Sequence, residues 1–231
     1  MKEHPILFSP VMVEAILEGR KTMTRREITI HANGIEEIVL NERWPNSNWK
    51  QFIGRRAYKT TPVAYEALQM FNCPYGQIGD RLWVKETHFL FGAWKRNGVT
   101  SAGKEKWKFV PHELIGVRYL DNPPLNFKTS RDKENPGQPK WYKRNSLFMP
   151  KWASRITLEV TAVRAERLQE ITEQDAIDEG VLSGIRYESS GFPIQVLPSE
   201  SFEILWESIN GPDSWKANPF VWVITFKKIK Q

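Results

Sequence analysis

The stretch "RITLEVTAVRAERL", residues 155–168, alternates apolar and polar side chains over most of its length. A period of two is typical of a strand that buries one face, so we predict a strand over about residues 155–164. The run "FVWVITFKKI", Phe220–Ile229, is rich in β-branched and aromatic residues and predicts a second, closing strand. We expect both strands to belong to one β-structure.

One short helix is predicted before these strands and another between them. Thr172 is placed as an N-cap with Asp175 as its capping-box partner, and Gly180 follows as the stop signal. Near the N-terminus, "PILF" predicts a short strand, and Ser9 precedes an apolar periodic run that ends at Gly19. This run predicts a helix over residues 10–18. A further amphipathic helix is expected at "SFEILWESI", residues 201–209.

Strands outnumber helices in this interpretation, and their irregular spacing argues against a repeated βαβ pattern. We therefore expect an α+β fold, a mostly antiparallel β-barrel with short helices, formed by a single domain over residues 1–231. "RLWVKE", residues 81–86, adds another strand. Long insertions are expected at about 28–72 and 92–146, and within the second only "LIGVRYL", residues 114–120, has a strand pattern.

Composition limits the compartment and the cofactors. The chain has 231 residues, a hydrophobic fraction of 40%, and one cysteine, Cys73, which excludes an intrachain disulfide and a cysteine-based zinc site. No run approaches 18 apolar residues, so we expect a soluble, cytoplasmic protein without a membrane segment. His4, His31, His88 and His112 lie far apart without ligand spacing, and we expect no metal or organic cofactor.

The positive charge is concentrated in one segment. Residues 91–150 hold twelve Lys or Arg against five Asp or Glu, a net charge of +7, while the other 171 residues sum to −1. Tryptophans stand directly among these cations in "AWKRNG", "GKEKWKF" and "KWYKRN". Cations pair with phosphates and flat rings stack on bases, so the segment predicts contact with single-stranded nucleic acid. The alternative is a solvated insertion with a few anchoring aromatic residues.

The stretch "EGRKTMTRRE", residues 18–27, packs four cations and two threonines together. A threonine is a poor nucleophile until a base takes its proton, and crowding by Arg20, Arg25 and Arg26 would lower the pKa of Lys21 toward that role. Residues 21 and 24 point to opposite faces of a regular strand, so Lys21 and Thr24 can cooperate only across a turn or bulge. A charged surface turn is the alternative interpretation.

"GRKTMTRR", residues 19–26, resembles the ASCH domain signature Gly-x-Lys-x-x-Glu-x-Arg, which belongs to the PUA-like β-barrels. Gly19, Lys21 and Arg26 fill their positions, and Thr24 stands where many members have Glu. Threonine there resembles the small bacterial members that remove the acetyl group from N4-acetylcytidine. The blocks "CPYGQIGDRLWVKET" and "MPKWASRITLEV" resemble a larger, phage- and prophage-associated subgroup.

The resemblance implies an amidohydrolase acting on an N4-acylated cytidine, free or in nucleic acid. Carried over to this chain, the catalytic set is Lys21 as base, Thr24 as nucleophile and Glu179 for the leaving amine. Lys21 could instead activate water that Thr24 orients. Non-catalytic RNA or DNA binding to a modified base, or ribonuclease activity, are the alternatives that the family and the basic segment leave open.

Five further residues are candidates for binding the substrate. Arg26 shares a strand face with Thr24 and could orient a carbonyl or phosphate, and Arg25 adjoins it. Trp83 and Trp152 lie in the family-like blocks and could stack on a base, although core packing explains each equally well. Arg155, at the start of the long predicted strand, is the fifth.

Overall fold

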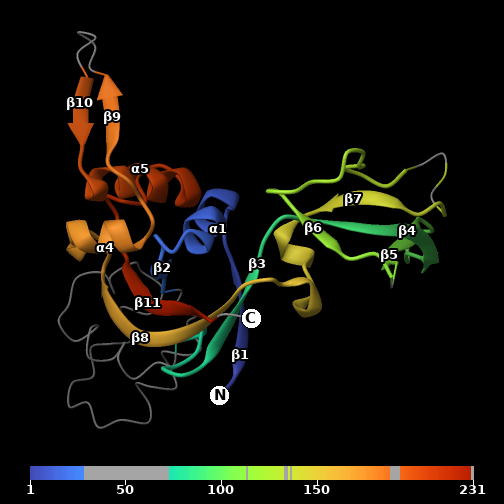
Figure 1. Cartoon of the computed structure of the whole chain (residues 1–231), viewed down its shortest axis with the longest axis horizontal. Coiled ribbons are helices and arrows are strands. Elements are labelled where there is room, and N and C mark those ends of the chain that lie inside the picture. The colour runs from blue at the N-terminus through green and yellow to red at the C-terminus, as the bar shows by residue number, and fades with distance from the viewer. Residues whose placement is uncertain (29–72, 113, 133–134, 136, 188–192, 230–231) are drawn as a thin grey trace.

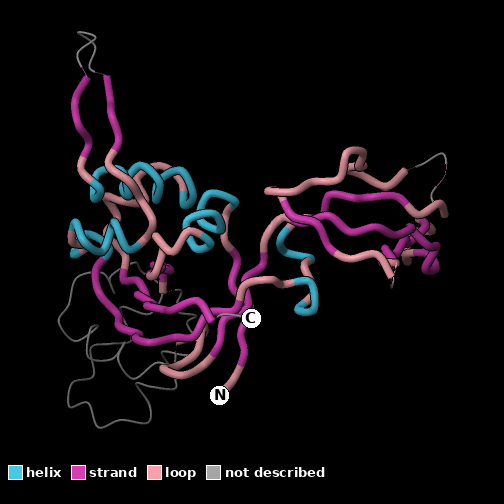
Figure 2. Tube along the Cα trace, viewed as in Figure 1, coloured by secondary structure: helices cyan, strands magenta, loops and turns pink. Residues whose placement is uncertain are grey.

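The computed structural model describes residues 1–28, 73–112, 114–132, 135, 137–187 and 193–229 (Figures 1 and 2). The first expected insertion, 28–72, falls almost entirely outside these residues, as does His31. Across the described residues, the chain is an α+β structure with two main sheets that are mostly antiparallel. Among the described residues, no helix is both long and apolar enough to cross a membrane.

The central sheet has five strands in the order β1-β3-β8-β11-β2. They are β1 (Glu3–Leu7), β3 (Arg81–Lys85), β8 (Thr157–Arg167), β11 (Phe220–Ile229) and β2 (Met23–Glu27). β1 runs parallel to β3, and the other three pairings are antiparallel. β8 sweeps through the sheet as a long arc (Figure 1). A closed barrel is not found among the described residues, where β1 and β2 are the two ends of the strand order.

Local sequence signals predicted the helices closely. These are α1 (Pro10–Leu17), α4 (Glu173–Asp178) and α5 (Pro198–Asn210). The capping box of α4 is confirmed, because the Thr172 hydroxyl accepts from the Asp175 N–H and the Asp175 carboxylate accepts from the Thr172 N–H. Ser9 occupies the N-cap position of α1, but its side chain makes no capping hydrogen bond.

The helices bury two apolar clusters against the central sheet. Val13 and Ile16 of α1 pack in one cluster with Ile224 of β11. Ala176 of α4 packs in the other cluster with Val223 of β11. Successive residues of a strand point to opposite faces, so residues 223 and 224 place the clusters on opposite faces of the sheet. Each face of β2 and β11 is therefore buried.

The segment expected as an insertion at 92–146 contributes most of a second sheet instead of a largely irregular excursion. Its strands are β4 (His88–Val99), β5 (Glu105–Pro111), β6 (Val117–Tyr119) and β7 (Lys140–Arg144). β5 and β6 pair with β4 along one edge, and β7 pairs along the other. Only β6 had been predicted, because frequent cations hide the period-two pattern of the other three strands. Figure 1 shows this second sheet on the right, apart from the helices of the central sheet on the left.

Candidate active site

Lys21 and Glu179, which are 158 residues apart in sequence, form a buried ion pair. The Lys21 ammonium donates to Glu179 Oε2 at 2.6 Å and to the Glu179 carbonyl oxygen at 2.7 Å. Neither residue is more than 3% exposed. The backbones also meet, since the two residues form a β-bridge and the Thr22 N–H donates to the Asp178 carbonyl at 2.8 Å. The chain that leaves α1 is thus joined directly to the C-terminal end of α4.

Gly180 allows this close approach. Its φ of +83° lies in the left-handed region, as expected of a residue that ends a helix. A β-carbon at this position would lie 2.9 Å from Lys21 Cβ and 3.0 Å from Ala15 Cβ. The position of Gly180 in the sequence predicted the end of the helix. The contact with Lys21 depends on tertiary structure.

We expect Gly180→Ala to lower the free energy of unfolding by about 2–4 kcal/mol, because left-handed strain adds to crowding against Lys21. Gly19→Ala is the matched control, since Gly19 has a φ of +81° and a β-carbon added there would have no neighbour within 4 Å. That change should cost only about 1–2 kcal/mol. Urea unfolding of both variants measures the difference. Equal losses would contradict a specific role for the Lys21 contact.

Thr24 and Arg26 lie on the same face of β2 as the Lys21 ammonium. Their register partners on β11 are Ile224 and Trp222, both members of the cluster that packs under α1. The Lys21 Nζ lies 5.6 Å from the centre of the Phe8 ring, and the Arg26 guanidinium lies 5.3 Å from it. Thr22 stands outside β2, so an irregular residue separates Lys21 from the strand.

Thr24 is 2% exposed, so its hydroxyl is buried as Lys21 and Glu179 are. The hydrogen bonds of Lys21 Nζ go to Glu179, and within the described chain none joins it to the Thr24 hydroxyl. The resting arrangement thus pairs the expected base with the expected acid. Catalysis by Thr24 would require Lys21 to turn from Glu179 toward the hydroxyl, or to reach it through a water molecule.

Arg25 points to the opposite face and meets three carboxylates, one of which, Glu179, it shares with Lys21. Its Nη2 lies 2.6 Å from Glu166 and 2.9 Å from Asp175, and its Nη1 lies 3.5 Å from Glu179 Oε1. The guanidinium also packs over the Phe202 ring at 5.9 Å. Arg25 is only 4% exposed, and its ion pairs with Glu166 of β8 and Asp175 of α4 hold β2 against these two elements. Arg25 was predicted to contact the substrate, but its guanidinium is instead occupied by these carboxylates.

Burial is the largest influence on the pKa of Lys21 and lowers it, because the charged form loses its hydration. The attraction and hydrogen bond of Glu179 oppose this shift, while Arg26 and Arg25 add to it. The net direction is downward from the ordinary lysine value. A lysine in this environment releases its proton more readily than a solvated one, as a general base requires.

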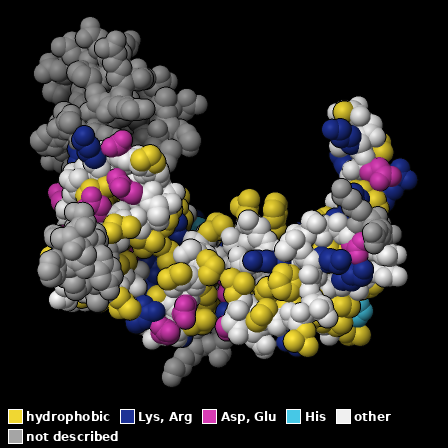
Figure 3. Space-filling view, turned by 90° about the horizontal axis from the view of Figure 1, so that it is seen from above, with side chains coloured by type: hydrophobic (Ala, Val, Ile, Leu, Met, Phe, Trp, Pro, Cys, Tyr) yellow, Lys and Arg dark blue, Asp and Glu magenta, His cyan; other side chains and the backbone are white. Residues whose placement is uncertain are grey.

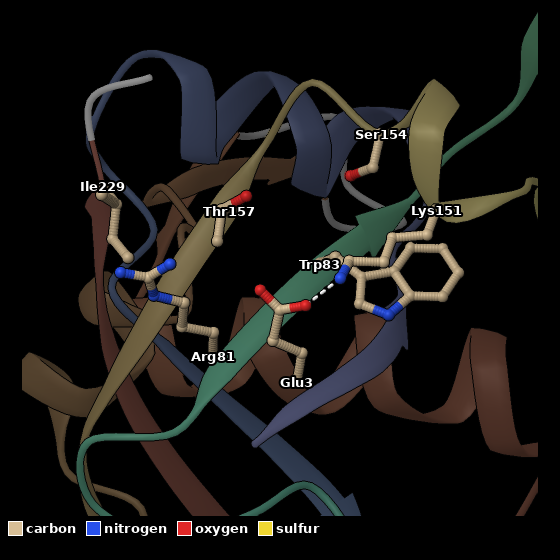
Figure 4. A pocket seen from close by; sticks show the side chains of 7 residues that line it. All are labelled: Glu3, Arg81, Trp83, Lys151, Ser154, Thr157 and Ile229. Carbon is tan, nitrogen blue, oxygen red and sulfur yellow. Dashed lines mark hydrogen bonds and ion pairs between the residues drawn. The ribbon is translucent and has the colours of Figure 1, made fainter. Parts of the chain in front are cut away.

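The remaining candidates do not join this cluster in the described structure. Trp83 lies beside a cavity of about 460 Å³, which Figure 4 shows with its lining of Glu3, Arg81, Trp83, Lys151, Ser154, Thr157 and Ile229. Trp83 is paired with Thr157, whereas its neighbour Leu82 belongs to the core cluster of Ile224. The cavity therefore opens on the sheet face opposite to Thr24.

Arg155 and Trp152 have different surroundings again. Arg155 donates from Nε and Nη2 to the two oxygens of Glu86 and from Nη1 to Asp121, and its guanidinium stacks on Tyr119 at 4.0 Å. These contacts use its charge to link the two sheets. Trp152 is 62% exposed in a 3₁₀ turn (Lys151–Ala153). Its ring is accessible for stacking, but it is not part of the Lys21 cluster.

Among the described residues, no group of three or more His, Cys, Asp or Glu side chains is arranged to hold a metal ion. His88 is fully buried, and burial lowers its pKa. Its Nδ1 lies 3.0 Å from the Glu86 carbonyl oxygen, which indicates a packed histidine. Sequence reasoning missed the roles of Phe8 and Glu166 and predicted Asp175 only as a capping partner, because their contacts with β2 leave no local pattern.

No family model, curated protein or solved structure matches this chain. Its class is therefore defined by its own geometry, as an α+β chain with two mostly antiparallel sheets and a buried lysine–glutamate pair between β2 and α4. The functional assignment depends on the chemistry of that pair and of the buried Thr24, three residues from Lys21 in sequence.

Proposed function

We propose that this chain is an amidohydrolase on a PUA-like ASCH scaffold and removes the acyl group from N4-acylated cytidine. The supporting observation is the buried Lys21–Glu179 pair, with Thr24 buried on the same face of β2 as the lysine ammonium. Three residue types suited to amide hydrolysis thus come from two distant parts of the chain. Their order along the chain also agrees with the ASCH resemblance.

Acyl transfer needs a base for the hydroxyl proton and an acid for the leaving amine, and Lys21 and Glu179 can supply both. Transfer of the shared proton from Lys21 to Glu179 yields a neutral amine and a carboxylic acid, and burial favours the neutral form of Lys21. Thr24 Oγ then bonds to the acyl carbon while its proton passes to Lys21. The bond to N4 breaks, and the Glu179 carboxyl gives its proton to the leaving amine. The result is an acyl-threonine and the original ion pair.

Hydrolysis reverses these roles. Water attacks the acyl-threonine carbonyl, and the Glu179 carboxylate takes its proton. The Lys21 ammonium returns a proton to Thr24 Oγ as the ester bond breaks. A direct attack by water, with Lys21 as base and Thr24 only orienting the water, is the alternative route. Trapping an acetylated Thr24 peptide by rapid quench and mass spectrometry would distinguish the covalent route.

A non-catalytic reader of a modified base is the second candidate function. It is favoured by the hydrogen bonds of Lys21 to Glu179 Oε2 and to the Glu179 carbonyl oxygen, which a purely structural pair would also make. The amidohydrolase and the reader are distinguished by incubating the protein with N4-acetylcytidine and, separately, with an N4-acetylated oligonucleotide. Ultraviolet absorbance follows the loss of the acetyl group. We expect conversion to cytidine in at least one substrate. Binding of either without conversion would contradict the amidohydrolase and support the reader.

The pH dependence of activity provides a more specific prediction. If neutral Lys21 alone takes and returns the proton, as in the water route, kcat/KM should rise with pH through the lowered Lys21 pKa, below the range of a solvated lysine. In the covalent route, which uses the proton shared with Glu179, kcat/KM should fall there instead, because the pair then has no proton for the leaving amine. Arg26 contributes to the lowering, so Arg26→Gln should raise the Lys21 pKa and move the rise or the fall to higher pH. Arg26→Lys keeps a positive charge and is the control, with a smaller expected shift. An unchanged profile in Arg26→Gln would contradict Lys21 as the titrating base.

A further inference from the structure

The register of the second sheet separates its cations into two faces. Lys95 lies opposite Lys108, and both Arg118 and Lys143 lie opposite Phe89. Alternation along β5 places Lys106 on the same side as Lys108. We call this side the basic face. It is formed by Lys95, Lys106, Lys108, Arg118 and Lys143 together with Phe91 and Trp141.

A contact across β4 confirms that the residues of the basic face share one side. The Arg118 guanidinium of β6 lies 5.7 Å from the centre of the Trp141 ring of β7, although β6 and β7 pair with opposite edges of β4. The Trp141 ring also meets Phe91, with ring centres 5.6 Å apart. The aromatic residues thus occupy the middle of the face, with cations around them.

The charges of this face are not neutralised within the described structure. All five cations are exposed, and none of them has a carboxylate partner among the described residues. The opposite face differs, because Arg96 pairs with Glu105 there and Lys140 pairs with Asp132. Figure 3 shows Lys and Arg side chains spread over the arm that carries this sheet. Five exposed cations without a carboxylate partner in the described chain therefore gather on the basic face, while Arg131 and Arg144 of the opposite face are half-buried and stack on aromatic rings.

We propose that the basic face binds single-stranded nucleic acid. Exposed cations on neighbouring strands attract a phosphodiester backbone, and a half-buried tryptophan among them offers a ring on which an unpaired base can stack. Duplexes hide the faces of their bases, and the carboxylate side chains of an acidic peptide carry no ring that could stack on Trp141. This binding surface goes beyond the proposed amidohydrolase, since it requires neither Lys21 nor Thr24.

Fluorescence anisotropy of the full chain with labelled 12-mers of uridine and of thymidine tests the surface. We expect binding that weakens as salt increases. Replacing Lys95, Lys106 and Lys108 together by Gln should weaken it at least about tenfold at low salt and reduce the salt dependence. Trp141→Ala should weaken it roughly tenfold, while Trp141→Phe should retain most of the affinity because a ring remains. Thermal unfolding verifies that each variant is folded.

The matched control replaces three cations associated with the opposite face, Arg96, Arg131 and Lys140, by Gln. It removes the same formal charge from the same sheet, and Arg131 stacks there on Trp107 at 4.2 Å. We expect less than about a threefold change in affinity. Equal weakening by both triple variants would overturn the assignment to one face. Undetectable binding at low salt, or equal affinity for single strands, duplex and heparin, would overturn the proposal.

Discussion

Lys21→Arg is expected to reduce kcat by roughly 100- to 10,000-fold, nearly as much as Lys21→Ala. A guanidinium keeps the positive charge beside Glu179 but does not release a proton near neutral pH, so it cannot act as a base. Lys21 and Thr24 would act as one unit. Lys21→Ala, Thr24→Ala and the double variant should therefore lose similar amounts of activity instead of multiplying their losses.

Two control variants distinguish a loss of catalysis from a change in positive charge. Arg20 belongs to the same motif, but its guanidinium pairs with Glu18 and the Gly180 carbonyl, so Arg20→Lys should leave kcat within about threefold. Thr24→Ser keeps a hydroxyl and should retain part of the rate. Release of cytidine from N4-acetylcytidine measures each variant, and thermal unfolding verifies that it is folded. A fully active Lys21→Arg protein would refute the general-base role and indicate a cationic clamp.

Arg25→Met is expected to lower the free energy of unfolding by about 3–5 kcal/mol near neutral pH. The change leaves Glu166, Asp175 and Glu179 close together without the guanidinium that they surround. Arg164→Met is the matched control, because Arg164 pairs with the first two of these carboxylates but is 43% exposed in its side chain. Solvent screens such a pair, and its loss should cost no more than about 1 kcal/mol.

The effect of Arg25→Met should shrink in acid. Burial raises the pKa of Asp175, but a hydrogen bond from Thr172 and the charges of Arg25 and Arg164 outweigh it and lower the pKa. A lowered carboxyl pKa contributes stability above the unfolded-state value, and this contribution is lost as pH falls through the folded-state value. Wild type and Arg25→Met should therefore converge in urea unfolding below about pH 4. A constant difference down to acid pH would indicate that packing, and not charge, explains the loss.

Local signals in the sequence were sufficient for several elements. Alternation predicted β8, although the strand begins two residues later than expected and extends to Arg167. β-branched and aromatic residues predicted β11 with its observed bounds. Capping residues predicted α4 and its end at Gly180. Each of these features depends on residues that are neighbours along the chain, which is why no partner had to be known.

The second sheet and the face of each cation required the tertiary structure. β4 pairs with β7, about fifty residues further along the chain, and the register of that pairing decides which side chains share a side. The grouping of twelve basic residues was visible in the sequence, but their distribution over the two faces of the sheet was not. A shift of one residue in register would exchange the two faces.

The sequence by itself determined that Lys21 and Thr24 are three residues apart in a cationic motif, and that Glu179 ends a capped helix. Only the tertiary structure decided that Lys21 and Glu179 meet at 2.6 Å, that Arg25 turns away toward three carboxylates, and that Gly180 leaves room for the contact. The physical reason is that propensity and capping act between near neighbours. Ion pairs and burial depend on segments that approach each other only when the sheet and helices pack together.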